Sequence, residues 1–383
     1  MAVSFGSVSK MGLFWGLCII FLFLVASKGI LCFVNDEMCG VNLKLQGFAG
    51  PRVVSTSNGD TGPPGSWPWM VSAGELSSEG VWEHRCGGTI IASNLVLTVA
   101  HCAFDDRWLI RTGDRDLNSS FDDAKVITRR IKKIHVHPKY VYDLTAYYDV
   151  AIWELDEDVE YNIFHRPICL PREPSLDLDK YEGDQVTVLG WGLQTSNGGQ
   201  SDNILKQTPV KVFSNLFCNT THSNFDSDIL QFRTKATLPN LFKDHLMCAG
   251  YELGNFGSCS GDSGGPIVRL LTTPPNIRYI QVGIVQGGVG DCGDSRYPGI
   301  YIRLNDPDIL AFIQSVADTG SPPSTVRTSP APVPVVTSSA PRPIQENPSR
   351  VGPGALGQGS VGSGAIGLGS SNSGGFFANQ ALG

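Results

Sequence analysis

The chain has 383 residues, enough for one large domain or two smaller ones with flexible ends. Its formal net charge of −7 is modest, and no run of lysine and arginine marks a surface for nucleic acid, so we expect no such partner. The ten cysteines contain no CxxC pair, which argues against a zinc site.

The first segment, residues 1–32, is predicted to be a secretory signal peptide. Lys10 precedes an apolar run from Met11 to Ala26, and the small residue Ser27 follows. A signal cut between Ser27 and Cys32 and an uncleaved membrane anchor both fit this pattern. The run is shorter than the roughly 20 apolar residues that a bilayer-spanning helix needs. Its length therefore favours the signal peptide. We therefore expect a secreted, extracellular protein with no stable membrane span.

From about Val53 to Leu304, short stretches rich in Val, Ile and Thr alternate with turn residues. Many short strands of this kind predict an all-β barrel or sandwich. The clearest stretches are Leu95–Val99, Val126–Ile131, Val186–Leu189, Ile280–Val285 and Ile300–Ile302. One helix is predicted at the end of this region, capped by Asp306 or Asp308, with the helically spaced apolar residues Ile309, Phe312, Ile313 and Val316.

The composition changes after about Thr319. Residues 321–350 are rich in Pro, Ser and Thr, and residues 351–375 consist mostly of Gly, Ser and small apolar residues. A segment of this composition cannot bury a core, so residues 319–383 are predicted to be a disordered tail. An O-glycosylated stalk and a flexible extension without a specific role both fit it, and a third interpretation makes the tail a tether to an extracellular matrix.

Three short motifs carry residues suited to nucleophilic catalysis. The run Cys259-Ser260-Gly261-Asp262-Ser263-Gly264-Gly265-Pro266 sets a serine among glycines, whose backbone can turn N–H groups toward a carbonyl. His101 follows an apolar stretch beside Cys102, and Asp149 opens another apolar stretch that would carry its carboxylate inside. A serine hydroxyl needs a base and an orienting acid. Each motif alone fits a structural role, but the three together predict a serine nucleophile.

Over roughly residues 39–317 the chain resembles the chymotrypsin-like (trypsin-fold) serine peptidases. Besides the three motifs, the matching landmarks are Trp67-Pro68-Trp69, Cys86-Gly87-Gly88, Pro167-Ile168-Cys169-Leu170-Pro171, Gly190-Trp191-Gly192, Met247-Cys248-Ala249-Gly250 and Pro298-Gly299-Ile300-Tyr301. The resemblance implies two six-stranded antiparallel β-barrels with a C-terminal helix, an active site in the cleft between them, and a catalytic domain over residues 53–318.

The resemblance also implies the residue roles. Ser263 attacks the scissile carbonyl, and His101 takes its proton and gives it to the leaving amine. Asp149 holds the imidazole, and the N–H groups of Gly261 and Ser263 form the oxyanion hole. The expected function is a serine endopeptidase that acts on protein or peptide substrates without a cofactor, and protein protease inhibitors are expected partners. The alternative is a non-catalytic binding homologue of the same fold.

By the same resemblance, the implied disulfides are Cys86–Cys102, Cys218–Cys248, Cys259–Cys292 and Cys39–Cys169. One bridge of the family is missing, because Val186 and Arg269 stand at its two positions. The sequons at Asn118 and Asn219 are candidate glycosylation sites in the secretory pathway, although either could be an ordinary loop asparagine.

Arg52-Val53 is the expected activation site, where a trypsin-like protease would cut the zymogen. The new N-terminus at Val53 would pair with Asp262, because a buried carboxylate needs a charged partner. Cys39 would keep the propeptide, residues 33–52, attached by its disulfide. His84 and Ser72 match family residues that hold the same acid before cleavage. The segment after Val53 is longer than usual in the family, so the sequence defines the exact position of the cut less clearly.

The specificity pocket is expected to have Gly257 at its base and Gly288 and Gly299 on its walls. Gly257 supplies no carboxylate for a basic substrate residue, so we expect cleavage after large apolar residues. Gln286-Gly287 departs from the serine and large aromatic that the family has there, and the rival binding function rests on this departure.

A family calcium loop would fall between Asp114 and Asp123. Four acidic residues could supply oxygen ligands, namely Asp114, Asp116, Asp122 and Asp123. Phe121 and Ala124 stand where further acids are expected, so a solvated acidic loop is favoured and no metal is predicted.

Overall fold

The computed structural model describes residues 39–41, 65–105, 107–119, 125–141, 147–194, 203–223, 242, 245–271 and 278–320. The predicted signal segment, the Arg52-Val53 site and the tail from residue 321 onward lie outside these residues. Within the described part, no helix combines the length and apolar character that crossing a membrane requires.

Six strands from the first half of the chain close into an antiparallel barrel in the order β1-β2-β3-β6-β5-β4. They are β1 (Met70–Leu76), β2 (Trp82–Ala92), β3 (Leu95–Thr98), β4 (Leu109–Thr112), β5 (Ile127–Val136) and β6 (Ala151–Leu155). Strand β3 is buried along its whole length, as its continuous apolar sequence predicts, whereas β5 carries several exposed residues.

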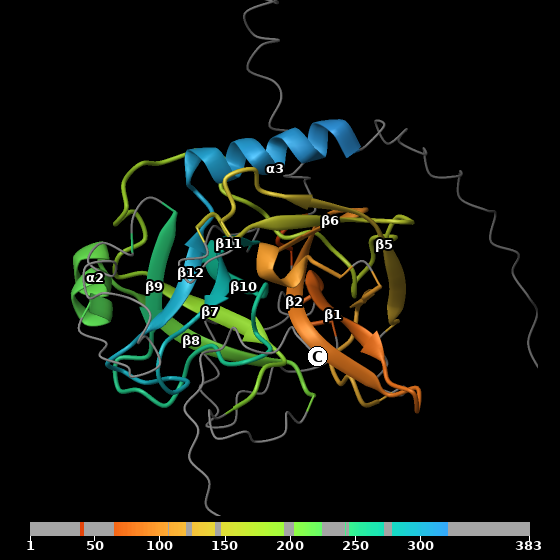
Figure 1. Ribbon diagram of the computed structural model, residues 1–383, viewed down its shortest axis with the longest axis horizontal. Helices are drawn as coiled ribbons and strands as arrows, with labels where there is room; N and C mark the ends of the chain where they lie inside the picture. The colour runs from red at the N-terminus through yellow and green to blue at the C-terminus, as the bar shows by residue number, and fades with distance from the viewer. Residues whose placement is uncertain are drawn as a thin grey trace, which may run out of the picture. The chain divides into compact units, whose positions relative to one another are not determined.

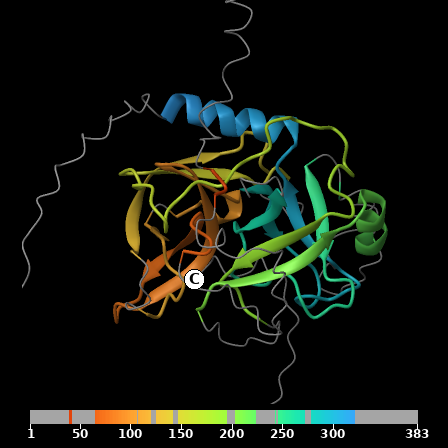
Figure 2. The same ribbon diagram turned by 180° about the vertical axis from the view of Figure 1, so that it is seen from behind.

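Six later strands close into a second antiparallel barrel in the order β10-β11-β12-β9-β8-β7. They are β7 (Gln185–Gly190), β8 (Lys206–Val212), β9 (Leu246–Gly250), β10 (Pro266–Leu271), β11 (Arg278–Gly287) and β12 (Gly299–Arg303). Figures 1 and 2 show the two barrels side by side, with the first in orange to olive and the second in green to blue. The prediction of two six-stranded barrels is confirmed.

The C-terminal helix α3 (Pro307–Gly320) is also confirmed, and it extends beyond the predicted domain end at residue 318. Asp306 caps it, because its Oδ1 accepts hydrogen bonds from the N–H groups of Asp308 (2.9 Å) and Ile309 (3.1 Å). Although α3 follows the last strand of the second barrel, it lies beside β6 of the first barrel (Figure 1). Two further short helices are present, η1 (Ala100–Cys102) and α2 (Asn215–Ser223).

The two barrels are joined through buried polar contacts. The backbone N–H of Gly87 on β2 donates to the carbonyl of Ser263 (2.7 Å). Thr89 Oγ1 on the same strand donates to Gln281 Oε1 on β11 (2.8 Å), and both residues are fully buried. These contacts fix the loop around Ser263 against the first barrel, which carries His101 and Asp149.

Candidate active site

His101 and Asp149 meet because β3 and β6 are antiparallel neighbours. Thr98 at the end of β3 pairs with Ala151 at the start of β6. His101 follows β3 in the short helix η1, and Asp149 lies just before β6. Two residues far apart in sequence are thereby brought to the same edge of the barrel.

The contact between them is close and doubled. Asp149 Oδ2 lies 2.6 Å from His101 Nδ1, and Asp149 Oδ1 accepts the backbone N–H of His101 at 2.8 Å. The Asp149 side chain is fully buried, whereas 25 % of the His101 side chain is exposed. The carboxylate therefore fixes the imidazole and leaves its Nε2 edge toward the solvent-accessible side.

Burial lowers the pKa of His101, but the charge of Asp149 and its hydrogen bond outweigh this effect, so the net pKa is raised. A base with a raised pKa holds a transferred proton more strongly, which suits an imidazole that takes a proton and passes it on.

The main chain of Ser263 lies next to Cys102, the residue after His101. Its carbonyl oxygen accepts the N–H of Gly87 and lies 3.9 Å from Cys102 Sγ. Among the described residues there is no hydrogen bond from Ser263 Oγ to His101 Nε2. Such bonds are often long before substrate binds. The structure thus joins His101 to Asp149 and brings the main chain of Ser263 to Cys102, the residue after His101.

The two N–H groups expected to bind an oxyanion belong to Gly261 and Ser263. Within the described part of the chain, neither donates to a protein acceptor. Gly261 has a φ of +95°, a backbone conformation that side-chain-bearing residues rarely adopt. Its carbonyl oxygen lies 2.9 Å from His84 Nε2, which holds this peptide in place.

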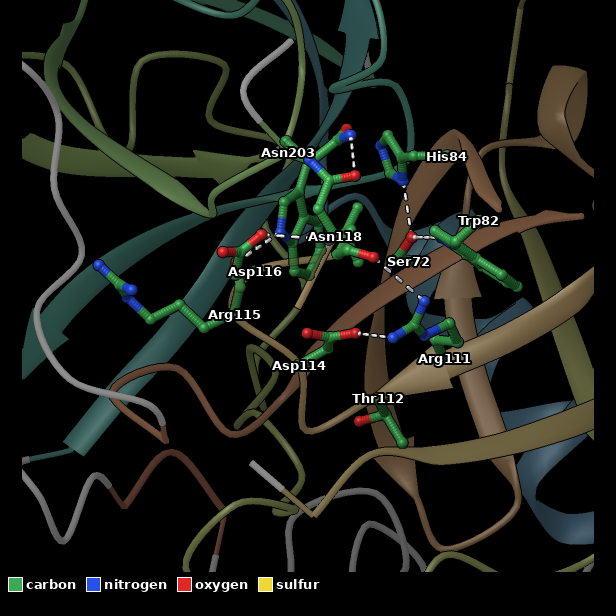
Figure 3. Close-up of polar contacts among 12 residues, drawn as sticks. Ser72, Trp82, His84, Arg111, Thr112, Asp114, Arg115, Asp116, Asn118 and Asn203 are labelled. Carbon is green, nitrogen blue, oxygen red and sulfur yellow. Dashed lines mark hydrogen bonds and ion pairs between the residues drawn. The ribbon is translucent and has the colours of Figure 1, made fainter. Parts of the chain in front are cut away.

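His84 is itself oriented by its neighbours. Ser72 Oγ accepts the indole N–H of Trp82 (2.9 Å) and donates its own proton to His84 Nδ1 (2.7 Å), as Figure 3 shows. The remaining ring proton is then on Nε2 and points at the Gly261 carbonyl. Burial lowers the pKa of His84 to about 4, although the bond to Gly261 partly offsets this, so the ring stays neutral.

Asp262 points away from His84. Its carboxylate accepts the N–H of Gly192 and the N–H of Cys259, both at 2.8 Å. Burial raises its pKa to about 6 against the effect of these two bonds. His84 and Ser72 therefore contact each other and Gly261 in this conformation, and they do not hold the acid as the resemblance implied for a zymogen.

The four disulfides present are the four pairs that the resemblance implied: Cys39–Cys169, Cys86–Cys102, Cys218–Cys248 and Cys259–Cys292. Cys86–Cys102 lies beside His101, and Cys259–Cys292 ties the nucleophile loop to the pocket wall. These bridges therefore hold both sides of the cleft.

Gly257, Gly288 and Gly299 all line one pocket. A Cβ at Gly299 would lie 2.9 Å from Ser258 Oγ and 3.0 Å from Tyr301 OH, so a larger residue would force these side chains to move. Ser258 Oγ and Tyr301 OH, both buried, lie 3.2 Å apart behind it. The pocket therefore has a polar hydroxyl pair next to its base, which the sequence pattern did not reveal.

Two carboxylates also line this pocket, Asp291 and Asp294. Asp294 is held by the Arg296 guanidinium, with Nη2 at 2.7 Å and Nε at 3.1 Å, and its pKa is lowered mainly by this hydrogen bonding. Sequence reasoning missed both residues because it considered only the glycine positions. A Cβ at Gly287 would meet no atom within 4 Å, so the space of the usual aromatic is open.

The acidic loop and the two sequons do not line this pocket. Asp114 forms a buried ion pair with Arg111, which lies over the ring of Trp82 (Figure 3), while residues 120–124 are outside the described part. Asn118 is exposed, with its Oδ1 accepting Asn203 Nδ2 at 2.9 Å. Asn219 is half-buried in α2, and its amide is tied to the neighbouring chain.

Comparisons with known proteins agree with this geometry. The family model described as Trypsin matches residues 56–313. The chain is 32 % identical over 296 residues to venom serine protease Bi-VSP of Bombus ignitus, covering 75 % of this chain and 76 % of that protein. It is 35 % identical over 246 residues to a venom protease of Bombus pensylvanicus, covering 63 % of this chain and 90 % of that protein.

A third relative is serine proteinase stubble of Drosophila melanogaster, which is 35 % identical over 256 residues. That match covers 65 % of this chain but only 30 % of the relative. The residues matched by the family model include both barrels. The chain therefore belongs to the Trypsin family and is a chymotrypsin-like serine endopeptidase.

Proposed function

We propose that this endopeptidase cleaves peptide bonds with Ser263 as nucleophile, His101 as general base and acid, and Asp149 as the group that orients His101. The observation that carries the proposal is the double contact of the buried Asp149 with His101, at 2.6 Å and 2.8 Å. This contact favours the tautomer with a proton on Nδ1 and leaves Nε2 free to accept the serine proton.

The reaction would proceed through an acyl-enzyme. Ser263 Oγ bonds to the substrate carbonyl carbon as its proton moves to His101, and the proton then passes to the leaving amine. The negative oxygen is stabilised by the N–H groups of Gly261 and Ser263, whose lack of protein acceptors in the described part supports this role. Water, activated by His101, then hydrolyses the ester and frees Ser263.

The proposed preference is for large apolar residues before the cut bond. Gly257 offers no charge at the base, and the nearby carboxylate of Asp294 is already paired with Arg296. The wall residue Val289 is buried and apolar. The Ser258 and Tyr301 hydroxyl pair would add a polar partner at the pocket end for a tyrosine substrate. At the base itself a buried substrate cation would find no counter-charge, and the pocket's other carboxylate, Asp291, comes from the segment beside Cys292 and not from the base.

The protein is proposed to be secreted as a zymogen and cut after Arg52 by a trypsin-like protease. The buried Asp262 supports this, because within the described residues its carboxylate has only two N–H partners and no cation. A new ammonium group at Val53 would supply the missing charge. Protein protease inhibitors are proposed as further partners.

The propeptide would stay attached after this cut. Cys39 is bonded to Cys169, and Gly40 adds two backbone hydrogen bonds, from its N–H to Pro167 O (2.8 Å) and from the N–H of Tyr279 to its carbonyl (2.9 Å). The propeptide end is thus held both covalently and by main-chain pairing.

Peptide hydrolysis tests this proposal directly. The secreted protein is treated with trypsin, which is then inhibited, and is assayed beside Ser263→Ala on peptides with Phe, Leu, Ala or Arg before the cut. Cleavage after Phe or Leu that the variant lacks supports both the catalytic residues and the pocket. Cleavage mainly after Arg would overturn the pocket assignment. No cleavage after a verified cut at Arg52 would favour the binding homologue and direct attention to Gln286 and Gly287.

A further inference from the structure

The residue before Asp149 has an unusual backbone conformation. Tyr148 has a φ of +48°, in the left-handed region that is unfavourable for a residue with a bulky side chain. The carbonyl of Tyr148 accepts the N–H of Val150 at 2.7 Å, so Tyr148, Asp149 and Val150 form a tight three-residue turn. The Asp149 side chain projects from the centre of this turn, so its position depends on the conformation of Tyr148.

A residue from the other barrel holds this conformation. His245, just before β9, is fully buried, and its Nε2 accepts the backbone N–H of Tyr148 at 3.0 Å. The two rings are also stacked, with centroids 4.2 Å apart and planes 17° from parallel. One histidine therefore fixes both the main chain and the side chain of Tyr148.

Two further contacts complete the support. The ring of His137 is stacked on Tyr148 at 4.7 Å with planes 6° apart, so Tyr148 lies between the two histidines. The Tyr148 hydroxyl donates to Asp308 Oδ2 on α3 at 3.0 Å, and Lys139 pairs with the same carboxylate at 2.5 Å. Residues from three parts of the fold therefore contact this turn: His245 before β9, His137 after β5 and Asp308 on α3.

The bond from Tyr148 requires a neutral His245. Nε2 must keep its lone pair to accept the N–H, so the ring proton is on Nδ1, which has no hydrogen-bond partner within the described part. Burial lowers the pKa of His245 to about 4, and the neighbouring His137 and Arg303 lower it further, while Asp149 opposes them. The ring is therefore neutral throughout the range in which His101 would work as a base.

We propose that His245 and Tyr148 are positioning residues for catalysis: His245 holds Tyr148 in its left-handed conformation, and this turn places Asp149 against His101. The proposal rests on the proposed role of Asp149 as the group that orients His101. In this proposal the second barrel, through His245, helps to align His101 and Asp149, which both belong to the first barrel.

Two substitutions separate the hydrogen bond from packing. His245→Gln can place an amide oxygen near the position of Nε2, whereas His245→Phe keeps a stacking ring but offers no acceptor. We expect His245→Phe to lower kcat by about tenfold to a hundredfold, the usual cost of a misplaced catalytic group, with KM little changed. His245→Gln should stay closer to the parent protein.

The pH profile provides a readout that a purely structural role would not move. Asp149 raises the pKa of His101, so loss of its alignment in His245→Phe should shift the acid limb of kcat/KM to lower pH. Tyr148→Asn in the His245→Phe background should restore part of kcat, because asparagine adopts the left-handed conformation more readily. If His245→Phe folds poorly, Tyr148→Val on the parent His245 tests the same turn, because a β-branched residue is disfavoured in the left-handed conformation. It should lower kcat and shift the acid limb in the same direction, and an unchanged kcat and acid limb would overturn the proposal.

The matched control is His165→Gln, since His165 is equally buried but contacts Asn162 and Thr112 outside this stack. It should lower the melting temperature without moving the acid limb. The proposal is overturned if His245→Phe has the parent's kcat and acid limb, or if His165→Gln shifts the limb equally. Failure of the proposed function is a different result, since the parent protein itself would then show no activity that Ser263→Ala abolishes.

Discussion

The backbone N–H of Gly192 donates a 2.8 Å hydrogen bond to Asp262 Oδ1. Gly192 follows β7, and Asp262 is the residue before the proposed nucleophile. A Cβ at Gly192 would lie 2.5 Å from the Asp262 carboxyl carbon, so the two can approach only because residue 192 is glycine. The contact makes the charge state of Asp262 relevant to both the stability and the activation of the protein.

Replacement of this acid should change how the stability of the uncut protein depends on pH. Burial raises the folded-state pKa of Asp262 from 3.8 to about 6, so its contribution is fully present below 3.8 and is lost as pH rises through 6. In an uncleavable Arg52→Gln background, Asp262→Asn removes this charge but leaves one of the two N–H groups, of Gly192 or Cys259, without an acceptor. Relative to the parent, its free energy of unfolding should therefore be about 1–3 kcal/mol more favourable at pH 7 than at pH 4.

Thermal unfolding of the two uncut proteins from pH 4 to 7 measures this difference. A gap in melting temperature that is equal at both ends would show that the carboxylate charge is not the cause. The same Asp262→Asn change in the cleavable protein should abolish activity after the cut, because Val53 would then lack its carboxylate partner.

The open space at Gly287 should accept an aromatic residue. A Cβ there meets no atom within 4 Å, so Gly287→Trp is expected to fold normally. The new ring would cover the pocket entrance and bury substrate apolar surface, which should lower KM for Phe and Leu peptides several-fold. Unchanged KM in a folded variant would show that this position does not contact substrate. Ser78→Trp, at an exposed turn between β1 and β2, is the control.

The two sequons should behave differently. The amide of Asn219 donates from Nδ2 to Asn215 Oδ1 (2.8 Å) and Phe242 O (3.3 Å), and an attached glycan would disrupt these bonds. The Asn118 amide is exposed. We expect Asn118→Gln to lose the mobility shift caused by glycosidase treatment and Asn219→Gln to keep it. The reverse pattern would contradict this assignment.

The tether at Cys39 should determine the fate of the propeptide. After the cut at Arg52, the two chains should run together on a non-reducing gel and separate on a reducing one. In the Cys39→Ser/Cys169→Ser protein, the hydrogen bonds of Gly40 and the bond from Arg278 Nη1 to the carbonyl of residue 39 should not retain the propeptide through gel filtration. Retention there would show that main-chain pairing is sufficient.

Much of the fold and of the cleft could be predicted from sequence. The strand stretches, the closing helix and the motifs around His101, Asp149 and Ser263 are local patterns whose physical causes act within a few residues. The sequence patterns predict only the C-terminal helix and miss α2. The segment Asn215–Ser223 consists largely of poor helix formers, so its local sequence gives no helix signal. The helix is fixed instead by the Cys218–Cys248 bridge and by His222, whose Nε2 lies 3.0 Å from Pro298 O.

The sequence by itself determined the strands, the three motifs and, by resemblance, the partners of eight cysteines. Only the tertiary structure decided which groups surround each of them: the neutral His84 on Gly261, the glycines around Asp262, the paired carboxylate of Asp294 in the pocket, and the two histidines that enclose Tyr148. The reason is physical. Periodicity and turn residues act along the chain, whereas burial and hydrogen bonding depend on neighbours that only the closed barrels bring together.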